Sequence, residues 1–336
     1  MVKKLILVFG FIVALILASV VGWTMLAENK AYTPSDGGNM YVKLDKGMNF
    51  KGLTAKLAKD GLVKNEKIFL FRARIHGWDT SIKAGLYEVK PGENADDLME
   101  KMVRGETAPS IAVTIPEGYT VKQIARKLSE NGIIDAAAFL NAAKKYHSDA
   151  IPAPSAQCIY PVEGYLFPDT YYFMHNSTPE DIIKKMTEQF NKVADAKYQQ
   201  EIKAKGLSLS QAVIIASLVE REAKAASERP IIAGVFMKRL SIGMPLQSCA
   251  TVQYLLPKQK EKLYYKDLKI DSPYNTYKYP GLPPGPIANP GKPSLMAVAN
   301  AQENSGYLYF VAKNNGTHTF SKTLAEHNAA KKMNRE

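Results

Sequence analysis

The chain has 336 residues, 46% of them hydrophobic, so it is long enough to hold two or three domains with a sizeable core. Its 44 Lys and Arg against 32 Asp and Glu give a net charge of +12, which indicates an anionic partner: nucleic acid, anionic lipid or a cell-wall polymer. Its two cysteines, Cys158 and Cys249, exclude a disulfide scaffold, and the sequence leaves open whether they pair or remain thiols.

An uncharged run from Leu5 to Ala27 follows Lys3 and Lys4. It exceeds the roughly 20 residues that a helix needs to cross a bilayer, so we predict a transmembrane anchor over residues 1–27. A cleaved signal peptide remains the alternative, although its apolar region is usually shorter. The two lysines indicate a cytoplasmic amino terminus. We therefore expect a single-pass protein of the cytoplasmic (inner) membrane with an extracytoplasmic, periplasmic C-terminal domain.

A polar linker is expected over residues 28–40, where "AENKAYTPSDGGNM" is rich in Gly, Ser and Pro. The lysines beyond it are scattered and form no arginine and aromatic platform. This distribution, together with the predicted anchor, argues against nucleic acid as the partner.

A pattern of one strand followed by one short helix recurs in the next part of the chain. "GMNFKGLTAKLAKDGLV" from Gly47 aligns without a gap with "GYTVKQIARKLSENGII" from Gly118, and "PGENADDLMEKMVRGE" is a looser copy. The apolar spacing predicts one buried helix face, and Gly61 and Gly132 stand where a left-handed helix cap is favoured. We predict small β-α modules over 41–110 and 111–160.

Longer helices and an irregular aromatic segment are predicted further on. "CIYPVEGYLFPDTYYFM" is typical of an ordered loop with a strand, serving either as packing or as a substrate-facing wall. "STPEDIIKKMTEQFNKV" predicts a capped amphipathic helix. Ser208 or Ser210 can cap a helix through "QAVIIASLVEREAK", which is apolar nearly all round and therefore buried, and an amphipathic helix is expected over 232–240.

Glu220 follows this apolar run, where burial makes a charged carboxylate costly. The helical period places it on the face of Ala216 and Ser217, whereas Glu222 points about 200° away. If that face lines a cleft, the carboxyl is half-desolvated, and desolvation gives a carboxyl the raised pKa that a general acid needs. The alternative is a structural ion pair with a neighbouring arginine or lysine.

The segment "DSPYNTYKYPGLPPGPIANPGKPSL" is dense in Tyr, Asn, Gly and Pro. Aromatic faces beside amide and hydroxyl groups are suited to a neutral, hydroxyl-rich sugar, and the prolines keep such a loop ordered.

Several motifs in one order carry a resemblance to a known family. "SLVEREA", "ASERPIIAGVFMKRL", "GMPLQSCATVQY", "SPYNTYKYPGLPPGPIANPG", "YLYFVA" and "HTFSKTLAEHN", with "EGYLFPDTYYF" upstream, resemble the MltG (YceG-like) family of membrane-anchored endolytic murein transglycosylases. The resemblance spans essentially the whole predicted ectodomain, and "LQSCAT" is a weaker analogue of a pattern in lysozyme-like transglycosylases.

The resemblance implies an α+β protein with a transmembrane helix, LysM-like β-α modules and a mixed α/β catalytic domain over 161–336. It implies that Glu220 is catalytic. The residues expected to contact the glycan lie in the shared motifs: Gln247, Ser248, Thr251, Tyr254, Tyr274, Asn275, Tyr277 and, upstream, Glu163. Cys249 stands where some relatives carry an Asp, so no acid-base role is transferred to it. Penicillin-binding proteins are implied as partners.

The implied reaction cleaves the β-1,4 bond between N-acetylmuramic acid and N-acetylglucosamine within nascent strands and limits their length. One carboxyl suffices, because it can protonate the glycosidic oxygen and then deprotonate the muramic acid 6-hydroxyl, which leaves a 1,6-anhydro end. Hydrolysis usually needs a second carboxylate, for which Glu222 and Glu163 are the candidates. A hydrolytic muramidase and a non-catalytic peptidoglycan-binding scaffold are the alternative functions.

No cofactor or metal is expected. The five histidines show no paired ligand spacing, and "HTFSKTLAEHN" separates its two by nine positions. "GPIANPGKPS" differs from a P-loop, because five residues separate Gly285 and Gly291 and prolines replace amide donors.

Overall fold

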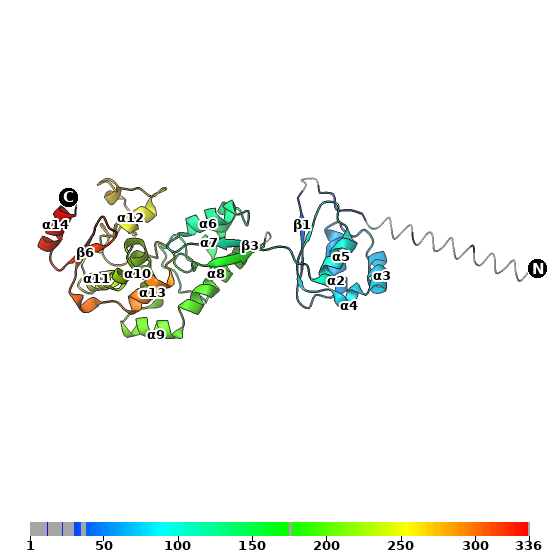
Figure 1. Cartoon of the computed structure of the whole chain (residues 1–336), viewed down its shortest axis with the longest axis horizontal. Helices are drawn as coiled ribbons and strands as arrows, with labels where there is room; N and C mark the ends of the chain where they lie inside the picture. The colour runs from blue at the N-terminus through cyan, green and yellow to red at the C-terminus, as the bar shows by residue number, and fades with distance from the viewer. Residues whose placement is uncertain (1–11, 13–21, 23–29, 35–37, 175–176, 335–336) are drawn as a thin grey trace, which may run out of the picture. The chain divides into compact units, whose positions relative to one another are not determined.

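The structure is a computed structural model that describes residues 12, 22, 30–34, 38–174 and 177–334. The chain divides into two compact units between Pro109 and Ser110, and each has a hydrophobic core of its own. Helices dominate both units, and the described strands form two-stranded antiparallel sheets (Figure 1). The fold is therefore mixed α/β, as the sequence predicts at this level.

The first unit contains one pair of antiparallel strands, with helices between and after the two strands. Strand β1 pairs with β2, with Met40 opposite Val89. Its elements are β1 (Met40–Leu44), α2 (Phe50–Lys59), α3 (Glu66–His76), α4 (Trp78–Ser81), β2 (Gly85–Val89) and α5 (Ala95–Arg104). Alternate strand residues and one face of each long helix fill its core.

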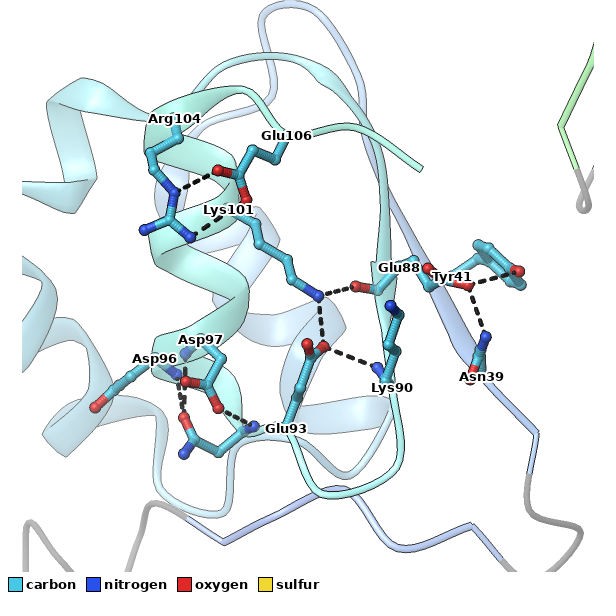
Figure 2. A network of polar contacts seen from close by, with 11 residues as sticks. Asn39, Tyr41, Glu88, Lys90, Glu93, Asp96, Asp97, Lys101, Arg104 and Glu106 are labelled. Atoms are coloured by element: carbon cyan, nitrogen blue, oxygen red, sulfur yellow. Dashed lines mark hydrogen bonds and ion pairs between the residues drawn. The ribbon is translucent and has the colours of Figure 1, made fainter. Parts of the chain in front are cut away.

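A network of polar contacts joins α5 to the end of β2 (Figure 2). The Lys101 ammonium donates to the Glu88 carbonyl at 2.9 Å and to the Glu93 carboxylate at 2.5 Å. At the start of α5, Asn94 and Asp97 form a capping box, in which each side chain accepts from the other's backbone N–H. The network fixes how the helix leaves the strand.

The second unit carries the longer helices. Its first half contains β3 (Ile111–Thr114), α6 (Val121–Glu130), α7 (Ala136–Lys145), β4 (Thr170–Phe173), α8 (Pro179–Val193), α9 (Ala196–Ala204) and α10 (Leu209–Glu222). Its second half contains η1 (Ala226–Glu228), α11 (Arg229–Ser241), α12 (Cys249–Leu255), η2 (Asp267–Lys269), α13 (Lys292–Ala299), η3 (Glu303–Ser305), β5 (Tyr309–Ala312), β6 (His318–Ser321) and α14 (Leu324–Met333). Strand β3 pairs with β4, and β5 with β6.

Helix α10 is the central helix of this unit. Ser208 caps it, as predicted, and every residue from Ala212 to Val219 is buried. Helices α11 and α13 pack against it (Figure 1). The face of Ala216 lies in the core and does not line a cleft: the Ser217 hydroxyl, for example, accepts from the Ile287 N–H at 3.1 Å.

The repeated strand-helix pattern is confirmed at the level of secondary structure. Helices α2, α5 and α6 each follow a strand and bury the predicted apolar stripe. Gly61 and Gly132 have positive φ angles of 79° and 66°. The predicted amphipathic helix over 232–240 is longer, Arg229–Ser241, and it is buried on most of its faces.

The predicted module boundary near residue 160 lies inside the second unit, where strand β4 pairs with β3. The predicted transmembrane helix falls almost entirely outside the described residues. Among the residues that the structure describes, no single helix is long and apolar enough to span a bilayer; only α9 and α10 taken together pass that test, and they are bent by 88°.

Candidate functional site

Glu220 lies in the last turn of α10, where the buried helix reaches the surface of the unit. Its side chain is 7% exposed. The Gly291 N–H, just before α13, donates to Glu220 Oε2 at 3.0 Å, and Arg229 Nη2, at the start of α11, lies 3.8 Å from Glu220 Oε1. Three packed helices therefore hold one carboxyl that retains limited access to solvent.

A second carboxyl, Glu117, lies beside Glu220. It comes from the loop between β3 and α6, and its carboxylate fills the space that a Cβ on Gly291 would occupy. Burial raises the pKa of Glu117, the negative charge of Glu220 raises it further, and Arg229 opposes both. Glu117, Glu220, Arg229 and Gly291 form what we call the acidic site.

Gly118 brings the Glu117 loop close to Glu220. Its φ is +76°, a left-handed value that favours glycine, and a Cβ there would lie 3.5 Å from Glu220 Cγ. Glu117 is not among the site residues predicted from the sequence. The two aligned copies nevertheless differ at this position. Both have the glycine, Gly47 or Gly118, but the residue before it is Lys46 in the first copy and Glu117 in the second, so the acidic residue is not part of the repeat.

Glu222 has different surroundings from Glu220. Its Oε1 accepts a 2.6 Å hydrogen bond from the Ser248 hydroxyl, and it lines a cavity of about 380 Å³. Gln247, Cys249 and Tyr277 line the same cavity, together with side chains of β5, β6 and α14. Among the described residues, Glu220 is not part of this lining.

Glu163, the other candidate for a second carboxylate, is fully buried. It accepts hydrogen bonds from the Val121 N–H at 3.1 and 3.2 Å, the Tyr254 hydroxyl at 3.0 Å and the Asn289 amide at 3.0 Å. Burial raises its pKa to about 8, although these donors and the nearby charge of Lys122 lower it. The Glu163 side chain has no exposed surface through which to make the predicted contact with glycan. Glu163 instead fastens the start of α6 to the core.

The residues expected to contact glycan fall into two groups. Tyr274 and Asn275 are buried, as are Ser248 and Thr251. The Asn275 amide donates to the Leu268 and Ile270 carbonyls at 2.9 and 2.8 Å, so it braces its own loop.

Gln247, Tyr254 and Tyr277 form the second group and are at least partly exposed. The backbone of Gln247 is left-handed, with φ of 48°. The Tyr277 hydroxyl lies 3.0 Å from Cys249 Sγ. Both cysteines are free thiols. A glycan-contacting role of these exposed residues stays a prediction.

The chain is similar to known proteins over most of its length. The YceG-like family model matches residues 42–333. An endolytic murein transglycosylase of Bacillus subtilis (strain 168) is 39% identical over 302 residues, which is 86% of this chain and 83% of that protein.

Two further relatives agree with this match. An endolytic murein transglycosylase of Streptococcus pneumoniae serotype 2 (strain D39 / NCTC 7466) is 36% identical over 298 residues, which is 81% of this chain and 54% of that longer protein. A crystal structure of a yceG-like protein from Listeria monocytogenes matches this chain with a TM-score of 0.60 and 34% identity. The match covers 87% of this chain and 99% of the Listeria chain. Because one model and these relatives span both units, the chain belongs to the YceG-like family.

Proposed function

We propose that the chain is an endolytic murein transglycosylase, that is, a lytic transglycosylase that cuts peptidoglycan strands. The relatives that carry this name align over most of the chain, and the family model matches residues 42–333, which include the acidic site. The observation that supports the chemistry is a partly exposed helix-end carboxyl, Glu220, with a backbone donor, a cation and a second carboxyl around it.

In the proposed reaction, protonated Glu220 donates its proton to the oxygen of the β-1,4 bond between N-acetylmuramic acid and N-acetylglucosamine. The C1–O bond breaks and leaves an oxocarbenium-like sugar. The Glu220 carboxylate then removes the proton of the muramic acid 6-hydroxyl, whose oxygen bonds to C1 and closes the 1,6-anhydro ring. The carboxyl ends protonated, as it began, so no water, second nucleophile or cofactor enters the cycle.

Glu117 is assigned a part in holding a proton at the site. Burial and the negative charge of Glu220 raise the pKa of Glu117, so Glu117 keeps its proton to a higher pH than an isolated carboxyl would. Arg229 limits this effect, and it stabilises Glu220 after the proton has left. We assign Glu220 as the acid and base, with Glu117 as its proton-sharing partner.

The rest of the chain fits a role at the membrane. Residues 1–27 are proposed as an anchor in the cytoplasmic membrane, with both units on its outer side. The first unit is proposed as a LysM-like module that holds glycan. Cutting near the membrane would limit the length of nascent strands, which makes glycan-polymerising penicillin-binding proteins the proposed partners.

The test is mass spectrometry of purified peptidoglycan after digestion by the full chain. Internal fragments with 1,6-anhydro-muramic acid ends are expected. Reducing muramic acid ends would show a hydrolytic muramidase instead. Binding to peptidoglycan without any released fragment would show a scaffold.

A further inference from the structure

A pocket of about 290 Å³ lies next to the acidic site in the second unit. Four cationic side chains line it: Lys122 and Arg126 from α6, Arg221 from α10, and Lys258 from the segment after α12. The other polar lining groups are amides and hydroxyls, such as Gln123, Gln253 and Tyr254. Among the described residues, no Asp or Glu belongs to this lining. We call it the basic pocket.

Arg221 links the basic pocket to the acidic site. It follows Glu220 in the chain, and its Nη1 lies 3.4 Å from the Gly118 carbonyl, to which it donates. A Cβ on Gly118 would lie 3.5 Å from Glu220 Cγ and 3.6 Å from Arg221 Nη1. The same short segment runs from Glu117 in the acidic site to Thr120 and Lys122 at the basic pocket. A ligand held at Glu220 can therefore reach the cations.

Unpaired cations around a concave surface bind carboxylates or phosphates through charge-assisted hydrogen bonds. No ion pair is recorded for Lys122, Arg126, Arg221 or Lys258 within the described chain, whereas many other lysines and arginines have acidic partners. The buried carboxyl beneath the pocket, Glu163, accepts from Tyr254 and has a raised pKa of about 8, so its charge offsets the cations little at neutral pH.

We infer that the basic pocket binds a carboxylate of the peptide stem carried by the muramic acid next to the cut. The inference rests on the proposed function, because a glycan at Glu220 places its peptide substituent within reach of Arg221. Stem recognition then selects strands that still bear peptides.

Arg126 and Lys258 are the residues to change. They come from different walls of the pocket, whereas Arg221 contacts the acidic site and Lys122 affects the pKa of Glu163. Lys127→Gln is the matched control, since Lys127 lies on the same helix, α6, but does not line the pocket. The substrates are peptide-bearing glycan strands and the same strands after an amidase has removed their stems and the lactyl carboxylates that this leaves have been converted to amides.

The full chain should cleave peptide-bearing strands about tenfold more efficiently than stripped strands, since one charge-assisted contact is worth at least 1.4 kcal/mol. Arg126→Gln and Lys258→Gln should each remove most of that preference and leave cleavage of stripped strands unchanged. Lys127→Gln should retain the preference. Equal cleavage of both substrates by the unmodified chain would overturn the stem site and leave the proposed function intact.

A binding measurement decides the question if no strand is cleaved, which would count against the proposed function. Calorimetry with the free stem peptide should give a binding signal for the full chain that Arg126→Gln weakens about tenfold. No difference between the two proteins would contradict the inference. In the same calorimetry, binding of glycerol phosphate polymer without any binding of the stem peptide would assign the pocket to phosphate. That result would also overturn the inference.

Discussion

Glu117 and Glu220 meet at Gly291: its N–H donates to Glu220 Oε2 at 3.0 Å, and the Glu117 carboxylate fills the place of its missing side chain. A residue with a Cβ at this position would push Glu117 away. The glycine therefore allows a strand-following loop and a helix end to bring two carboxyls together.

Glu117→Gln should shift the pH dependence of cleavage. The pKa of Glu117 is raised by burial and by the charge of Glu220, so Glu117 keeps its proton to higher pH. Glutamine removes this titrating group, so the alkaline limb of kcat/KM should move down by about one pH unit. Glu188→Gln, an exposed charge change on α8, should leave the profile unchanged. A profile that falls uniformly without moving would contradict proton sharing.

Arg229→Gln should move the same limb in the opposite direction. Arg229 opposes proton retention in the acidic site, so its loss extends activity to higher pH, although kcat falls because the ionised Glu220 loses a cation. Arg229 Nε also donates to the Ser294 hydroxyl at 3.2 Å. Ser294→Ala is the matched control, since it removes this contact but keeps the charge. A downward shift in Arg229→Gln would refute the assigned role.

Gly291→Ala should reproduce the pH shift expected for Glu117→Gln. The added methyl group displaces the flexible end of Glu117, so proton sharing is lost with little change in the core. Combined in one chain, the two substitutions should change kcat/KM no more than either one alone, because both remove the same interaction of Glu117. Comparing kcat/KM of the two single variants and the double variant measures the coupling between Gly291 and Glu117. Additive losses would show that Gly291 acts independently of Glu117.

Glu163→Gln should change how stability depends on pH. The folded pKa of about 8 lies above the ordinary 4.5, so this carboxyl's contribution to stability is complete below pH 4.5 and is lost as the pH rises through 8. The unmodified chain should therefore lose on the order of a few kcal/mol of unfolding free energy over this range relative to Glu163→Gln, which cannot ionise. Denaturant titrations at pH 5 and pH 8 compare the two. Identical pH dependence would contradict a buried, proton-binding Glu163.

Local signals in the sequence predict local structure well here. The apolar spacing of Leu53 and Leu57, or of Ile124 and Leu128, gives the buried helix faces, and Ser208 caps α10 as expected. These features depend on residues within a few positions of one another. Glu220 was also singled out by a local signal, a carboxylate after an apolar run.

The acidic site could not be assembled in this way, because Glu117, Glu220 and Gly291 come together only through the packing of separate elements. The prediction that Asn275 contacts glycan rests on the family motifs, and the structure shows its amide bonded to two backbone carbonyls. The sequence around Asn275 does not reveal these bonds, because an amide that braces a loop and an amide that binds a sugar have the same local sequence signature.

The catalytic role of Glu220 is tested most directly by product analysis of Glu220→Gln beside the unmodified full chain. Glutamine keeps an oxygen that can accept from the Gly291 N–H but cannot donate a carboxyl proton, so the variant should fold and bind peptidoglycan as before. It should release at least about 100-fold less 1,6-anhydro-muropeptide, the scale on which general acid catalysis contributes. Undiminished release of anhydro products by a folded Glu220→Gln chain would show that Glu220 is not the catalytic acid.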